Sequence, residues 1–241
     1  MLKDSKGNAF YGNLITGSEC GMRMQRSRGN SVFHNNFCDN LIQVDIKDFL
    51  STNKWYDGYP SGGNYWSDYS GTDSHSGLYQ NVTGNDGIGD LPYIIDRNNQ
   101  DNYPLMGMFS KFVVCWEGEE FSLAMTCNST VSNFRFNAQK RMVSFNVAGP
   151  NDTLGFCRIA VSNILIQDLW NNRFVVLVDG KEPVMVKNWT ENMQTYLYFV
   201  YVHSDEHEVM IIPEFPFWRY HVILVFIIPL FAVIFKKRVR K

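Results

Sequence analysis

Cysteine is scarce in this sequence, and its 241 residues contain five cysteines with no C-x-x-C spacing. An odd number without such pairs argues against a disulfide-stapled scaffold and against a structural zinc site. Two interpretations stay open at this point. Either one disulfide forms among Cys115, Cys127 and Cys157, or the thiols are free and pack as small hydrophobic side chains.

Catalytic signatures are also missing. The chain has no G-x-S-x-G, no H-E-x-x-H and no phosphate-binding glycine-rich loop. His203 and His207 have i, i+4 spacing, which aligns two metal ligands on a helix but not on a strand or turn, as expected here. The other histidines show no paired spacing, so we expect no copper site, no certain cofactor and no enzymatic activity.

Basic residues are few outside the C-terminal end. The formal net charge is −2, and five of the 22 basic residues lie within 236–241, which leaves 17 against 24 acidic residues elsewhere. This acidic balance argues against nucleic acid as a partner. The N-terminal residues contain no apolar signal segment, so we expect either the C-terminal fragment of a longer precursor or insertion through the tail.

One long apolar run is present, since residues 218–235 read WRYHVILVFIIPLFAVIF. Eighteen helical residues span about 27 Å, close to the thickness of a hydrocarbon core. Trp218 and Tyr220 suit the outer interface, and Lys236, Lys237 and Arg238 follow as a positive-inside signal. The run predicts a single transmembrane helix over 218–235 and a basic cytoplasmic stub over 236–241. The preceding residues are then extracellular, and the membrane is a partner.

The N-terminal residues repeat with an offset of 22. Gly7-Asn8 returns as Gly29-Asn30, Asn13 as Asn35, Phe10 as Val32, Ile15 as Phe37, and Met22 and Met24 as Val44 and Ile46. Alternating apolar residues separated by glycine and asparagine describe short strands joined by tight corners. A period in the low twenties with this pattern predicts rungs of a parallel β-helix, in which asparagine stacks on asparagine.

Three longer strings follow the repeat: residues 55–69 read WYDGYPSGGNYWSDY, 84–96 read GNDGIGDLPYIID and 98–105 read NNQDNYPL. They resemble the terminal part of archaeal NosD-like (CASH-domain) right-handed β-helix surface proteins. The resemblance covers roughly residues 7–106 and implies that these strings form a cap on the open end of the solenoid. It implies no catalytic mechanism.

Two ligand sites are candidates within this cap. Asn85, Asp86, Asp90 and Asp96 offer hard oxygen ligands around two glycines, which suits calcium, although the EF-hand spacing is absent. Turn hydrogen bonding is the alternative role for these four side chains. The rings of Trp55, Tyr59, Tyr65 and Trp66 could stack on sugar faces, or they could pack on the last rung.

Residues 110–212 contain little glycine, since 14 of the 18 glycines lie before residue 111, and apolar and polar residues alternate more regularly here. Val143, Phe145 and Val147 share one strand face, Phe174–Val178 reads as a strand, and Asp179-Gly180 predicts a hairpin turn. About eight short strands predict an immunoglobulin-like or fibronectin-like sandwich. Several strings here, and the Pro-Glu-Phe-Pro segment at 213–216, resemble the module and linker that archaeal surface proteins place before their membrane anchor.

Four N-x-[ST] sequons, at Asn81, Asn128, Asn151 and Asn188, predict a glycosylated exterior, with ordinary polar turns as the alternative. The sequence therefore predicts an all-β protein divided into last β-helix rungs (1–50), cap (51–109), β-sandwich (110–212), proline stalk (213–217), transmembrane helix (218–235) and stub (236–241). We expect a non-catalytic, membrane-anchored surface module for adhesion, envelope or carbohydrate binding, with polysaccharides or cell-envelope proteins as partners.

The competing interpretation is the C-terminal fragment of a β-helix carbohydrate-active enzyme, or of a metal-delivery protein of the NosD type. An enzyme of this kind needs carboxylates clustered on one strand face across several rungs. The acids of the two rungs, which form no repeating column, are Asp4, Glu19, Asp39, Asp45 and Asp48.

Overall fold

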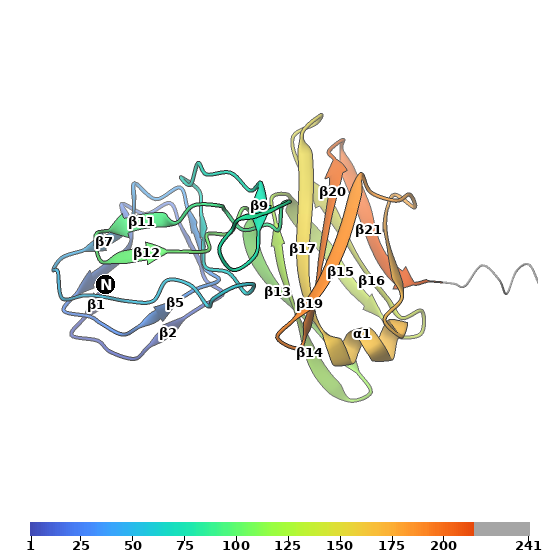
Figure 1. The fold of residues 1–241 in the computed structure, drawn as a ribbon, viewed down its shortest axis with the longest axis horizontal. Coiled ribbons are helices and arrows are strands. Elements are labelled where there is room, and N and C mark those ends of the chain that lie inside the picture. Colours follow the sequence, from blue (N-terminus) through green and yellow to red (C-terminus); the bar gives the residue numbers. More distant parts are fainter. Residues whose placement is uncertain (215–241) are drawn as a thin grey trace, which may run out of the picture.

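The computed structural model describes residues 1–214, so the predicted membrane helix, the stub and most of the stalk lie outside the described residues. The protein is mostly β and forms two parts that lie side by side (Figure 1). The first, blue to green in Figure 1, is built from short strands, and the second, light green to orange-red, is a sandwich of longer ones. Within residues 1–214, no helix is both long and apolar enough to cross a membrane.

The first part contains eight strands in parallel sheets and further short strands in its loops. The parallel strands are β1 (Leu2–Lys3), β2 (Ala9–Phe10), β3 (Leu14–Thr16), β4 (Cys20–Gln25), β5 (Ser31–Val32), β6 (Asn36–Cys38), β7 (Ile42–Ile46) and β8 (Tyr65–Trp66). They form three parallel groups, β1-β4-β7, β2-β5 and β3-β6-β8. Antiparallel pairs follow, formed by β9 (His75–Ser76) with β10 (Val82–Thr83), and by β11 (Tyr93–Asp96) with β12 (Asn99–Asp101).

The predicted 22-residue register is confirmed. Phe10 pairs with Val32, Ile15 with Phe37, and Met22 with Val44. A third, irregular coil follows the two expected rungs, because Lys54 bridges to Ser31 and β8 pairs with β6. This coil begins before residue 50 and reaches into the predicted cap. Its spacing departs from 22 residues, which is why self-comparison at that offset did not reveal it.

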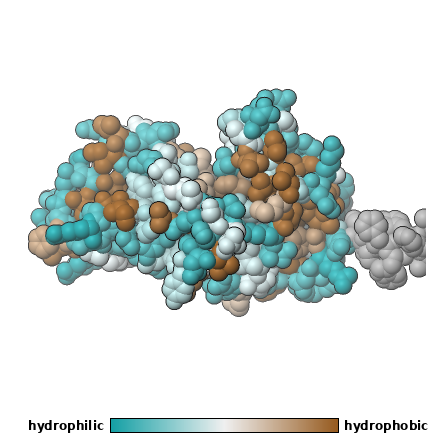
Figure 2. All heavy atoms as spheres, turned by 45° about the horizontal axis from the view of Figure 1, so that its top comes forward, coloured by the Kyte–Doolittle hydropathy of each residue, from teal (hydrophilic) through white to brown (hydrophobic). Residues whose placement is uncertain are grey.

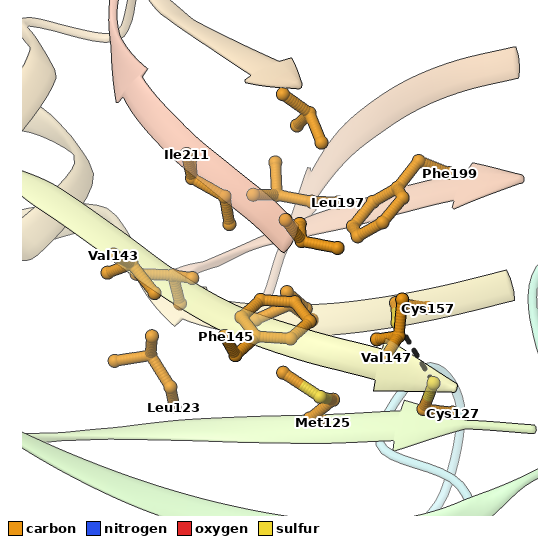
Figure 3. Packing of buried hydrophobic residues seen from close by; sticks show 14 of the residues in the cluster. Leu123, Met125, Cys127, Val143, Phe145, Val147, Cys157, Leu197, Phe199 and Ile211 are labelled. Atoms are coloured by element: carbon orange, nitrogen blue, oxygen red, sulfur yellow. Dashed lines mark hydrogen bonds between the residues drawn. The ribbon is translucent and has the colours of Figure 1, made fainter. Parts of the chain in front are cut away.

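The second part is a sandwich of nine strands in two antiparallel sheets that face each other across one core. One sheet has the order β13 (Met108–Trp116), β14 (Glu119–Cys127), β17 (Leu154–Ser162), β20 (Gln194–Val202) and β19 (Met185–Glu191). The other has the order β15 (Thr130–Asn137), β16 (Met142–Ala148), β21 (Glu206–Pro213) and β18 (Phe174–Val178). Val143, Phe145 and Val147 point into the core as their alternation predicts (Figure 3).

The strand order differs from the immunoglobulin arrangement. In that arrangement the first, second, fifth and fourth strands form one sheet. Here β13, β14 and β17 do neighbour one another, but the fourth strand, β16, lies in the opposite sheet between β15 and β21. Pro213, expected to open the stalk, ends β21 opposite Phe174, a strand-end position that tolerates the missing N–H.

Two local features of the sandwich depart from the sequence-based expectation. The segment Asn163–Trp170 forms helix α1 across one end of the sandwich (Figure 1), with Leu165, Ile166, Leu169 and Trp170 buried. Their spacing fits one helical face, a signal that the strand pattern around it obscured. Asp179 and Gly180 do form a tight turn with positive φ, but no hairpin continues from it. β18 pairs with β21 and β19 with β20, because Pro183 follows the turn and cannot donate to a ladder.

Candidate functional site

Two columns of asparagine run through the stacked coils. In the first, the Nδ2 of Asn13 donates to the Oδ1 of Asn35 at 2.8 Å, and the Nδ2 of Asn35 donates to the Oδ1 of Asn64 at 3.0 Å. Each asparagine side chain thus donates a hydrogen bond to the asparagine of the next coil. The column ends at Asp101, whose Oδ2 accepts the Asn64 backbone N–H at 2.7 Å. An ionised aspartate accepts and does not donate, so it is a suitable last member.

The second column has the same design. Asn8 donates to Asn30 at 2.8 Å and Asn30 to Asn53 at 2.9 Å. The backbone N–H of Asn53 then donates to the Oδ1 of Asn99, whose Nδ2 donates to the Oδ1 of Asp96 at 3.0 Å. Both columns therefore end on a carboxylate supplied by the residues after the last coil. Amide ladders were expected from the repeat, but their carboxylate ends were not.

Asp101 is a buried acid at the end of the first column. It is fully buried, and its carboxylate also accepts the Trp66 Nε1–H and the Tyr103 backbone N–H, each at 3.0 Å. Burial raises the pKa of Asp101 to about 7, although these N–H donors partly oppose the shift. A Cβ on Gly63 would overlap the Asp101 carboxylate, so a glycine is needed at position 63 for this approach.

The aromatic residues expected to stack on sugars are mostly interior. Trp55 and Trp66 are 0% and 1% exposed, and the Trp66 ring stacks on Phe37 with centroids 4.4 Å apart. Tyr59 and Tyr65 are half-buried against a smaller cluster around Ile88 and Leu105. Packing on the last coil, the alternative interpretation, is what the structure shows. The expected sugar-stacking surface is therefore not formed by Trp55 and Trp66.

The residues expected to bind calcium do not come together as a site. Asp86 accepts the Ile88 N–H at 3.0 Å, and Asp90 accepts the His75 N–H at 2.9 Å. Asp96 accepts the side-chain N–H of Asn99 at 3.0 Å. Asn85 donates to a backbone carbonyl. Within residues 1–214, no group of three or more His, Cys, Asp and Glu side chains could hold a metal ion. The oxygens serve instead as acceptors that fix turns.

Asp73, which the sequence did not single out, organises this loop. Its two carboxylate oxygens accept the backbone N–H groups of Asp86 at 2.9 Å and Gly87 at 2.8 Å. Burial raises the pKa of Asp73 to about 7, against the effect of these two donors. The segment thus has two neighbouring carboxylates, Asp73 and Asp86, close to the sandwich.

The two parts meet through buried polar contacts. The side chain of Asn36 donates to the carbonyl of Phe109 at 2.8 Å and accepts its N–H at 2.7 Å. This pair of bonds imitates a backbone ladder between β6 and the first strand of the sandwich. The ring of His34 stacks on that of Phe109 with centroids 4.2 Å apart, and burial lowers the pKa of His34.

Arg158 of β17 reaches across the same junction. It is 4% exposed, donates to the carbonyl of Pro60, and places its guanidinium 4.8 Å from the Tyr196 ring centroid. Its Nε has no hydrogen-bond partner, and no ion pair among the described residues includes it. Burial lowers the pKa of Arg158, and the charge of Asp86 opposes this shift. Sequence reasoning missed Arg158, because nothing local distinguishes an arginine within an apolar strand.

Two cavities lie at this junction. A polar cavity of about 240 Å³ is lined by Arg158, His34, Asp57 and Gln194 among others. A more apolar one of about 450 Å³ lies between the Asp73 loop and the outer face of the five-stranded sheet, at Phe156 and Tyr198. Figure 2 shows hydrophobic atoms gathered on the sandwich. Exposed apolar residues on and beside this sheet are Leu154, Val184, Val186 and Val202.

The sequons differ in their environment. Asn81, Asn128, Asn151 and Asn188 are all exposed. The Asn128 side chain, however, donates to the Leu154 carbonyl at 3.0 Å and accepts the Phe156 N–H at 2.8 Å, so its amide is already engaged. The predicted anchor residues Trp218, Tyr220, Lys236, Lys237 and Arg238 lie outside the described residues.

Comparison with known proteins gives one family. The comparisons with curated proteins and with solved structures gave no match. Residues 1–71, which include the two regular coils, the third irregular coil and both asparagine columns up to Asn64, match the family model described as periplasmic copper-binding protein (NosD). The N-terminal part of this chain is therefore NosD-like.

Proposed function

We propose that this protein is a non-catalytic, membrane-anchored module displayed on the cell surface, where it binds carbohydrate or another envelope component. The NosD-like match over residues 1–71 supports a periplasmic or surface location, since that family is described as periplasmic. The apolar run at 218–235 with its basic stub supports the anchor and the orientation. The display role rests on how the acids of the coils and the cap are used.

The observation that carries the proposal is that Asp45 and Asp48 of the coils both make structural contacts. Asp45 pairs with Arg23 at 2.9 Å and with Lys47 at 2.6 Å, and the Lys47 and Arg23 contacts lower the pKa of Asp45. Asp48 accepts the backbone N–H of Arg26 and the hydroxyl of Ser51. A general acid needs a raised pKa, whereas the contacts of Asp45 and Asp48 lower the pKa of both aspartates.

The junction supports display as well. Asn36 and Arg158 join coils and sandwich through buried contacts, so a ligand held by the first part is carried together with the second. The cavities between the parts provide concave surfaces on which a ligand can be held.

The proposal is tested on cells that express the full chain. Protease added outside should remove the chain up to about residue 217 and leave the basic stub protected. The purified full chain should bind one or more members of a panel of acidic and neutral envelope polysaccharides without releasing reducing ends. Protection of the whole chain would refute the orientation. Turnover that disappears in Asp45→Asn or Asp48→Asn would refute the non-catalytic role.

Metal delivery is the second candidate, because the matching family is described as copper-binding. A competition assay between the full chain and a chromophoric copper chelator separates the two functions. Retention of copper at one equivalent after gel filtration would favour metal delivery, and complete transfer to the chelator would favour the display function.

A further inference from the structure

Two cysteines face each other inside the sandwich. Cys127 is the last residue of β14, Cys157 lies in β17, and the two are direct partners in the antiparallel register of these strands. Their sulfur atoms lie 2.9 Å apart, closer than two unbonded sulfurs ordinarily approach. Figure 3 shows both side chains pointing at each other from neighbouring strands, beside Val147 and Met125.

The pair is buried. Cys127 and Cys157 are 2% and 0% exposed, and both belong to the sandwich core. The sulfur of Cys127 accepts the Ser129 backbone N–H at 3.4 Å, and the Tyr201 hydroxyl lies 3.7 Å and 3.8 Å from the two sulfurs. A reduced pair would bury two weak S–H donors in contact with each other, whereas a disulfide has no donors to satisfy.

We propose that Cys127 and Cys157 form a disulfide in the exported protein. This rests on the proposed extracytoplasmic location, because disulfides form and persist outside the reducing cytosol. In the reaction one S–S bond forms between the two side chains, which lose two protons and two electrons. An external disulfide such as oxidised glutathione accepts them and leaves as two glutathione thiols.

The bond would hold both sheets, although it lies within one of them. The chain between the two cysteines contains β15 and β16, which belong to the opposite sheet. Closing this loop therefore ties two strands of each sheet into one covalent ring. Because the folded core excludes solvent from both sulfurs, the exchange must take place before β14 and β17 pair.

The experiment is refolding of the full chain from denaturant in detergent, with either a glutathione redox buffer or a strong reductant. Thiol counting under denaturing conditions should give five free thiols in the reduced sample and three in the oxidised one. Tryptic mapping should join residues 112–135 to residues 142–158 with the loss of two hydrogens. Oxidation should raise the melting temperature by roughly 5–15 °C, as expected for a loop of this length in a domain of this size.

Cys115 provides the matched control, because it lies in the same tryptic peptide as Cys127 and could be mistaken for the linked cysteine, but it is exposed on β13. Cys115→Ser should leave the link and the melting shift unchanged, whereas Cys127→Ala with Cys157→Ala should abolish both. Five free thiols after oxidative refolding, or a link lost in Cys115→Ser, would overturn the proposal. These outcomes are independent of where the protein lies in the cell, so they do not bear on the proposed display function.

Discussion

Replacing Asn64 by aspartate changes one nitrogen into an oxygen in the middle of an asparagine column. Asn64 is fully buried, and its Nδ2 donates to the Val32 carbonyl at 2.9 Å and to the Trp55 carbonyl at 2.7 Å. In Asn64→Asp neither carbonyl has a donor, and both face an oxygen. Aspartate has nearly the same volume as asparagine, so the substitution changes the hydrogen bonding and not the packing.

The cost follows from those two contacts. Each buried polar group left without a partner costs about 1–3 kcal/mol, so the expected loss is about 4 kcal/mol near neutral pH. Burial should raise the pKa of the introduced carboxyl in the folded state. The folded state then binds a proton that the unfolded state releases, so the loss should grow as pH rises above about 4 and shrink below it.

Asn13→Asp is the matched control, since Asn13 begins the same column but is exposed. Water replaces the lost donor there, so the cost should stay below about 1 kcal/mol. Urea denaturation at pH 5 and pH 8, combined with hydrogen exchange of residues 30–37 and 53–66, measures both variants. Equal destabilisation by the two variants, or a loss in Asn64→Asp below about 1 kcal/mol, would refute the argument that the buried column stabilises the coils.

Three further expectations follow. The pKa of Asp101 is raised to about 7 by burial, so its contribution to stability should fall as pH rises from about 4 to 7, and Asp101→Asn should flatten that slope in urea denaturation. Asn128→Ala removes two hydrogen bonds to β17 and should cost about 1–3 kcal/mol in thermal denaturation, against less than about 0.5 kcal/mol for the exposed Asn188→Ala. Arg158→Met should leave stability within about 1 kcal/mol or raise it, because a buried guanidinium without an ion-pair partner is costly; strong destabilisation of that variant would contradict this.

Much of the first part could be predicted from the sequence, because stacked coils repeat their local pattern. Phe10 over Val32 and Asn13 over Asn35 follow from the 22-residue offset alone. The third coil escaped this reasoning. Its strand β8 pairs with β6 at a different spacing, so no periodic signal marks it.

The sandwich shows the same limit for strands and turns. Alternation was enough to place Val143, Phe145 and Val147 in the core and to define Phe174–Val178 as a strand. The pairing partner of each strand could not be predicted, because it does not depend on the residues next to it in the sequence. The Asp179-Gly180 turn formed as predicted, yet its two flanking strands belong to opposite sheets.

The amino-acid sequence by itself determined the coil period, the asparagine columns, the core-facing alternation and the apolar run at 218–235, since each depends on neighbours along the chain. Only the tertiary structure decided the roles of single polar residues. It buried Trp55 and Trp66, set Asp101 at the end of a column and placed Arg158 against Pro60. An aspartate in a glycine-rich loop has the same local pattern whether it binds a metal, caps a turn or ends a ladder. Its role depends on which distant backbone groups reach it, and folding alone brings those groups together.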